Sequence, residues 1–189
     1  MNEYADELPD DATSFSCVRD NVTGLIWEVK EASSTLPPLT ADRAATNHYT
    51  WYLNGSSGVQ TGSVQGAASS TCPSTSDCGL QTYINDVNSS DFCGGTNWRV
   101  PTYTELLGLL DYAKQGESTL LNSDFFPNQP SDTQLSSDSS SFMPYWTSQT
   151  AADGTSLSQA YIIDMSSAND LAYPKSNTAF VRLVRTPGE

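Results

Sequence analysis

The residues of this sequence that can do chemistry are few, and the four cysteines come first. They allow three disulfide connectivities among Cys17, Cys72, Cys78 and Cys93. A bond between Cys72 and Cys78 closes a short loop through Pro73 and would leave Cys17 for Cys93. A four-cysteine zinc site is the alternative, although the spacing lacks a CxxC pair. The even count, in a chain poor in lysine and rich in serine and threonine, predicts disulfides and an oxidising compartment.

Catalytic chemistry finds little support in the remaining residues. A cysteine nucleophile needs a free thiol beside a base, whereas these cysteines are expected to pair and His48 is the single histidine. A lone histidine here is expected to pack or to form hydrogen bonds rather than to bind a metal. Serine is too abundant to single out one nucleophile, and neither a GxGxxG motif nor a P-loop is present. We therefore predict that the protein is not an enzyme.

Calcium binding is the metal chemistry that the composition favours. Hard cations need several carboxylate and carbonyl oxygens close together, and the loop 123–138 offers such groups, with Asn128 among them. No EF-hand loop is present. We predict Ca²⁺ as the candidate cofactor, with these metal ligands: Asp124, Asp132 and Asp138.

Sugar binding is the second chemistry that the residue types allow. Sugars stack on aromatic faces, with amide and carboxylate groups beside them, and loops on a stiff scaffold commonly carry such groups. Tyr173 lies in a polar turn, which predicts exposure; packing on its own loop is the alternative. The predicted ligand-binding residues are Asp153, Tyr161, Asn169, Asp170, Tyr173, Lys175 and Asn177.

The charge narrows the class of partner. The net charge is −14, from 8 Lys and Arg against 22 Asp and Glu. Nucleic acid, anionic membranes and sulfated polysaccharides need a basic surface, so the sequence argues against all three. A neutral glycan or a protein at a host or cell surface fits better, and acidity that serves only solubility is the alternative.

The N-terminal residues and the hydropathy bear on location. No apolar run approaches the length of a membrane span, which argues against direct membrane insertion. The start, "MNEYADELPDDATSF", lacks the basic and apolar regions of a signal peptide. We expect an exported, extracellular or cell-surface protein whose signal or anchor is not present in this chain.

The elements that must position these residues follow from periodicity and turn residues. We predict a flexible segment 1–14 and one domain over 15–186, with a loop-rich insertion at about 31–79. A hairpin over 15–30 turns at Gly24, and Thr102 with Glu105 forms a capping box. The helices are expected at 80–89 and 102–114, and the strands at 142–150, 158–167 and 179–185. Helices first and an antiparallel meander last indicate the α+β class.

Four blocks of this sequence together resemble a known family. In chain order they are "TGLIWE", "CGGTNWRVPTYTELLGLLDY", "YWTSQT" and "AFVRLVR", and the match spans about residues 17–185. The combination closely resembles the family of the C-terminal domain of the Legionella collagen-like adhesin, a bacterial domain of unknown function. That family looks like a branch of the C-type-lectin-like fold.

The resemblance implies two helices packed on antiparallel sheets, long loops, and pairing of the N- and C-terminal strands. It also implies that three tryptophans lie in the core and that Arg99 is a structural residue paired with Glu105 or Asp111. Formylglycine-generating enzymes share the broad fold and a similar Arg-hydrophobic-Pro-Thr block, but their chemistry needs cysteines that this chain lacks after Cys93. The tryptophans are Trp27, Trp98 and Trp146.

In function, the resemblance implies a non-enzymatic adhesion or binding module of a bacterial cell-surface or secreted protein, which can be pilus-associated. Its loops would recognise a glycan or a protein. The Legionella relative is linked to sulfated glycosaminoglycans, a ligand that we do not transfer because of the charge of −14. One alternative is a sequence-diversified ligand-binding protein of a retroelement system. Another is a structural or assembly domain, for which an oligomer is possible.

Overall fold

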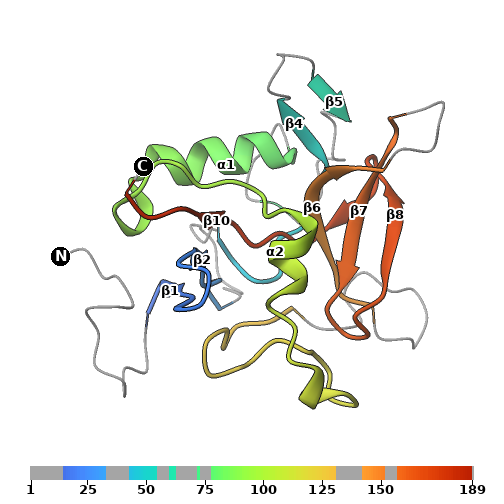
Figure 1. Ribbon diagram of the computed structural model, residues 1–189. Coiled ribbons are helices and arrows are strands. Elements are labelled where there is room, and N and C mark those ends of the chain that lie inside the picture. Colours follow the sequence, from blue (N-terminus) through green and yellow to red (C-terminus); the bar gives the residue numbers. More distant parts are fainter. Residues whose placement is uncertain are drawn as a thin grey trace.

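The computed structural model describes residues 15–32, 43–54, 60–62, 72, 78–130, 142–151 and 157–188. The predicted flexible segment 1–14 lies outside this part of the chain. Two helices and several antiparallel sheets confirm the α+β class (Figure 1). Within the described residues, no helix combines the length and the apolar character needed to cross a bilayer.

The N-terminal hairpin forms as predicted. Strands β1 (Cys17–Arg19) and β2 (Ile26–Glu28) pair antiparallel, with Val18 opposite Trp27. The Asp20 carboxylate accepts hydrogen bonds from the amide of Val22 and the hydroxyl of Thr23. Gly24 has a φ of 77°, a conformation that side chains disfavour. Local hydrogen bonds therefore set this turn.

The C-terminal strand closes the same sheet. Strand β10 (Val184–Arg185) pairs antiparallel with the other edge of β2 and places Val184 opposite Trp27. The order β1–β2–β10 pairs the C-terminal strand with the second strand of the N-terminal hairpin rather than with β1. The disulfide between Cys17 and Cys93 ties β1 to the short helix η2 (Phe92–Gly94).

The second disulfide joins Cys72 to Cys78, so that all four cysteines are paired. This arrangement confirms the predicted disulfides. Cys78 is buried directly before α1 (Leu80–Ser89).

Helix α1 has the predicted bounds. Its apolar residues recur at helical spacing and give one buried face, and the polar residues face solvent. The buried residues are Leu80, Tyr83, Ile84 and Val87.

The second helix is shorter than predicted. Helix α2 spans Tyr103–Leu107, and a separate turn, η3 (Tyr112–Lys114), follows. At Asp111 the backbone becomes extended, and its amide donates to the carbonyl of Leu120. Because the chain leaves the helix here, Leu110 is buried with Leu120 and Leu121. Tertiary burial therefore prevails over the helical pattern, which continues to residue 114.

The insertion that we predicted as loop contains three short strands. They are β3 (Tyr49–Thr50), β4 (Tyr52–Asn54) and β5 (Gln60–Gly62). The buried Trp51 donates its indole N–H to the carbonyl of Thr147, and the Trp146 indole donates to the carbonyl of Tyr49. These paired bonds join the insertion to the C-terminal sheet.

The largest sheet has the order β6–β7–β8. Its strands are β6 (Pro144–Thr150), β7 (Gln159–Asp164) and β8 (Asp170–Pro174), all antiparallel. The short strand β9 (Thr178–Ala179) pairs with β3. Figure 1 shows α2 between this large sheet and β10. The three predicted core tryptophans, Trp27, Trp98 and Trp146, are buried, as expected.

The interior also contains charge. Glu28 is fully buried, and its carboxylate accepts hydrogen bonds from the ammonium of Lys30, the hydroxyl of Tyr83 and the amide of Leu183. The guanidinium of Arg182 donates to the backbone carbonyl of Glu28 at 2.7 Å. Burial is the main reason why the pKa of Lys30 falls to about 8, although the Glu28 charge opposes the shift. A single buried carboxylate thus links the segments that flank β2 and β10 to α1.

Candidate functional site

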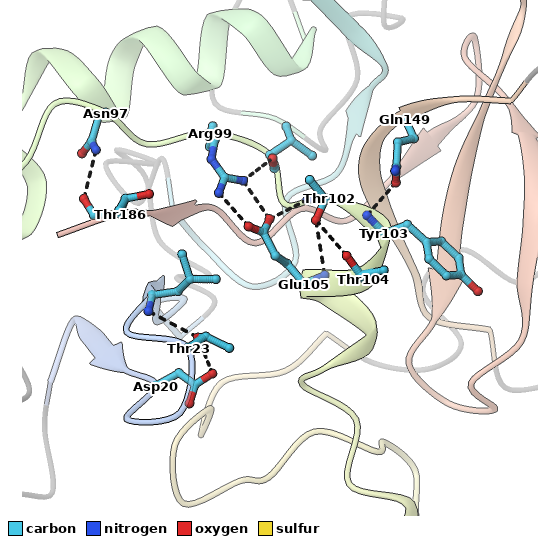
Figure 2. Close-up of polar contacts among 12 residues, drawn as sticks. Asp20, Thr23, Asn97, Arg99, Thr102, Tyr103, Thr104, Glu105, Gln149 and Thr186 are labelled. Atoms are coloured by element: carbon cyan, nitrogen blue, oxygen red, sulfur yellow. Dashed lines mark hydrogen bonds and ion pairs between the residues drawn. The ribbon is translucent and has the colours of Figure 1, made fainter.

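The N-terminus of α2 is held by side chains that the sequence predicted. The Thr102 hydroxyl accepts from the amide of Glu105, and the Glu105 carboxylate accepts from the amide of Thr102, which completes the capping box. Arg99 donates to both carboxylate oxygens of Glu105, at 2.8 and 2.7 Å (Figure 2). This confirms Glu105 as the partner of Arg99, whereas Asp111 caps η3 instead.

The Arg99 pair makes a testable contribution to stability. The hydrogen bond from Arg99 is the largest cause that lowers the pKa of Glu105 to about 2. Glu105→Gln should lower the free energy of unfolding at neutral pH by about 1–2 kcal/mol, because glutamine can cap the helix but cannot form the ion pair. Urea unfolding monitored by tryptophan fluorescence measures this loss.

The sign of the pH effect follows from the lowered pKa. The stabilisation by Glu105 is present above its ordinary pKa of 4.5 and is lost as the pH falls towards 2. The difference between Glu105→Gln and the unmodified protein should therefore shrink on acidification. Glu117→Gln is the matched control, because it removes an exposed ion pair to Lys114 and should cost less than about 0.5 kcal/mol. Equal losses in the two variants would contradict the prediction.

A bulge in β6 attaches α2 to the large sheet. Trp146 lies opposite Ile162 but Thr150 lies opposite Ala160, so the register shifts between them. Within this stretch the amide of Ser148 donates to the carbonyl of Pro101 at 2.8 Å. The Gln149 side-chain oxygen accepts from the amide of Tyr103 at 2.6 Å (Figure 2). Bulges commonly redirect a side chain in this way.

Tyr103 extends from α2 towards the face of the sheet. Its ring meets the ring of Tyr161 edge-on, with a centroid distance of 6.2 Å and an interplanar angle of 72°. Both rings are only partly buried. On β8 the residue opposite Tyr161 is Ala172, whose side chain is too small to cover the Tyr161 ring.

Asp170 brings a carboxylate to the same face. It lies opposite Ile163, two residues from Tyr161 on β7, and alternate residues of a strand share a face. The pKa of Tyr103 is raised by desolvation first, and then by the charge of Asp170 and a hydrogen bond to it. Tyr112, which is exposed, and Tyr161 also raise that pKa, so these groups lie within electrostatic reach of one another.

We call this set the tyrosine–aspartate surface. It offers aromatic rings, phenol hydroxyls, a carboxylate and a side-chain amide on a partly exposed face held by a sheet and a capped helix. Its members are Tyr103, Tyr112, Gln149, Tyr161 and Asp170.

The structure supports the sequence-predicted binding residues unevenly. It brings Tyr161 and Asp170 together, with the exposed Asn169 next to Asp170. Asn177 is exposed in the turn beyond the opposite end of β8 and is not part of the surface. Asp153 lies outside the described residues. Sequence reasoning missed Tyr103, Tyr112 and Gln149, although an aromatic residue directly after the Thr102 cap was a visible signal.

Two residues predicted to face a ligand pack inward instead. Lys175, predicted to bind a ligand, is 2% exposed, donates to the Thr150 hydroxyl, and lies 3.9 Å from the ring centre of Trp51, so little of its surface is open to a ligand. Burial lowers its pKa. Tyr173 packs against Trp146 at 5.6 Å and is partly buried, because it shares the core-facing side of the sheet with Ala160. Tyr173 therefore lies on β8 rather than in a turn, and it packs against β6 rather than on its own loop.

The predicted calcium ligands are described only in part. Asp124 is exposed, while Asp132 and Asp138 lie outside the described residues. Asn128 uses its amide to donate to the carbonyl of Lys30. Within the described ranges, no group of three or more His, Cys, Asp or Glu side chains could hold a metal ion. Calcium binding by the full loop stays a prediction.

The single histidine packs in the interior. His48 meets the ring of Phe180 edge-on at 6.0 Å, and burial lowers its pKa to about 4. The imidazole is therefore neutral at physiological pH, and it packs in the interior, as expected.

Comparison with known proteins agrees with the four sequence blocks. Among curated proteins, none matches this chain. A family model described as the Lcl C-terminal domain matches residues 16–185, which include both disulfides, α1, α2 and the whole tyrosine–aspartate surface. The chain therefore belongs to the Lcl C-terminal domain family.

Proposed function

We propose that this domain is a non-enzymatic binding module of a bacterial cell-surface or secreted protein, and that it binds a glycan through the tyrosine–aspartate surface. The observation that carries the proposal is the approach of Tyr103, Tyr161 and Asp170 on one partly exposed face of the sheet, where the two rings meet and Asp170 lies two residues from the position opposite Tyr161. Aromatic rings beside carboxylate and amide groups are the usual lining of a sugar site. A stiff scaffold beneath them limits the entropy lost on binding.

The proposal also includes a C-type-lectin-like fold for this domain and its export from the cell. The order of two helices followed by an antiparallel sheet, with terminal strands paired, supports a C-type-lectin-like fold. Two disulfides in a chain of this size support export, because such bonds persist in oxidising compartments. Fold alone does not establish an activity, so the argument for binding depends on the surface.

A glycan array tests this proposal directly. We expect the unmodified protein to bind a subset of glycans and Tyr103→Ala to reduce that binding by at least about fivefold, because each stacked ring contributes about 1 kcal/mol or more. Val22→Ala is the control, because Val22 is 94% exposed in the turn between β1 and β2. Thermal unfolding of each variant confirms that it is folded.

The array also separates the remaining possibilities. Parallel arrays with EDTA test whether calcium is a cofactor. Binding that Tyr103→Ala and Tyr161→Ala leave intact would refute this surface as the site. Failure of the folded protein on all glycans would refute glycan binding and favour a protein partner.

A further inference from the structure

Half of the basic side chains of this domain are buried, and most of the others are paired with carboxylates. Four of its 8 basic side chains are buried: Lys30, Lys175, Arg182 and Arg185. Three others are paired with carboxylates: Arg43 with Glu31, Arg99 with Glu105, and Lys114 with Glu117. The eighth, Arg19, is exposed on β1. The surface is therefore more acidic than a net charge of −14 suggests.

The negative charges are distributed in the opposite way. Among the acidic residues that the structure describes, only Glu28 and Asp164 are buried. Carboxylates therefore dominate the outer surface, and their summed field attracts cations and repels anions over several ångströms. Any ligand that approaches the tyrosine–aspartate surface meets this field first.

The tyrosine–aspartate surface itself also favours a cation at short range. Asp170 is exposed and lies on the same face of the sheet as Tyr161, two residues from the position opposite it, and the Tyr161 ring meets that of Tyr103. A cation gains from a carboxylate and from the negative face of an aromatic ring together. Phenol hydroxyls and the Gln149 amide add partners for hydroxyl groups, which a sugar carries and a lysine side chain does not.

We infer that the ligand of this surface is a cationic sugar, namely a glucosamine-type glycan whose amino groups are not acetylated. This inference rests on the proposed glycan-binding function and specifies its ligand class. The ammonium group lies against Asp170 and the tyrosine rings, while the sugar hydroxyls meet the phenols and Gln149. Acetylation of the amine removes the charge and leaves the rest of the sugar, so it isolates the contribution of the ammonium charge to binding.

The experiment compares two oligosaccharides that differ only in acetylation. Calorimetric titrations use the glucosamine tetramer and the N-acetylglucosamine tetramer at about pH 6, where the free amines are protonated. We expect the acetylated tetramer to bind at least about tenfold more weakly. Raising the salt from about 50 to about 300 mM should weaken binding of the glucosamine tetramer severalfold, because salt screens exposed charges.

Matched variants assign the effect to Asp170. Asp170→Asn keeps the shape and removes one charge, and it should weaken binding of the glucosamine tetramer about five- to tenfold. Asp91→Asn removes another exposed charge, from the residue before η2, and should change binding less than about twofold. Tyr103→Phe keeps the ring and tests the hydroxyl without emptying the site. Unfolding curves confirm that each variant folds.

The outcomes separate this inference from the proposed function. Equal binding of both tetramers, with Asp170→Asn unaffected, would overturn the cationic ligand and leave glycan binding intact. Binding of an oligolysine peptide, but of neither tetramer, would overturn it in favour of a protein partner. Absence of binding to both tetramers and to every glycan on the array would refute the proposed function as well.

Discussion

Replacing Glu28 with glutamine should lower the free energy of unfolding by about 3–5 kcal/mol, because it leaves a buried cation without its countercharge. The Glu28 carboxylate is fully buried and accepts from Lys30 at 3.0 Å. Arg182, also buried, contacts the Glu28 backbone, so two positive charges share this interior with one negative charge. Urea unfolding at neutral pH, monitored by fluorescence, measures the loss.

Glu31→Gln is the control for that experiment. The Glu31 carboxylate pairs with a cation too, the guanidinium of Arg43, but the Glu31 side chain is 44% exposed. Loss of this pair should therefore cost less than about 1 kcal/mol. If Glu28→Gln does not fold, the double variant Glu28→Gln/Lys30→Met provides the second measurement. It removes both charges and should be more stable than Glu28→Gln alone. A loss no larger than that of Glu31→Gln would refute the role of Glu28.

Removing the Cys17–Cys93 disulfide should cost about 4–5 kcal/mol, the second large effect. The two cysteines are separated by 76 positions, so the bond restricts a long stretch of the unfolded chain. It also fixes β1 to η2, where the Arg185 guanidinium donates to the carbonyl of Cys93 at 2.7 Å. Urea unfolding of Cys17→Ala/Cys93→Ala measures the loss.

The Cys72–Cys78 disulfide gives the matched comparison. Its sequence separation is 6, and the same entropy argument predicts a loss of only about 2 kcal/mol for Cys72→Ala/Cys78→Ala. Comparing the oxidised and reduced forms of the unmodified protein checks the result without any substitution. Equal losses in the two double variants, or alkylatable thiols in the folded, unreduced protein, would contradict this prediction.

Stability bears on the proposed binding because the residues of the tyrosine–aspartate surface come from several helices and strands rather than from one. The Arg99–Glu105 pair and the capping box hold α2, while the bulge of β6 holds Gln149 against Tyr103. Asp170 enters from β8, on the far side of β7. The tyrosine–aspartate surface therefore exists only when the sheet and α2 are both in place.

The N-terminal hairpin, α1 and the start of α2 could be predicted from the sequence because they depend on contacts between near neighbours. Asp20 bonds within its own turn, and the spacing from Leu80 to Val87 produces one apolar face. Thr102 caps α2 together with Glu105, which lies three residues further along the chain. The pairing of Arg99 with Glu105 is equally local. The class of fold and the family follow from such elements and their order.

Other features depend on residues far apart in the chain, and only the tertiary structure decided them. Helix α2 ends early because Leu110 is buried with Leu120 and Leu121, and Lys175 is buried because Trp51 lies beside it. Tyr103 meets Tyr161 because α2 packs on β7, and Asp170 reaches the same face from the neighbouring β8. Periodicity records which residues are apolar, but it does not record which distant segment covers them. The sequence by itself therefore determined the elements that local contacts fix, whereas long-range packing determined the end of α2, the short strands of the insertion and the side chains that form the surface.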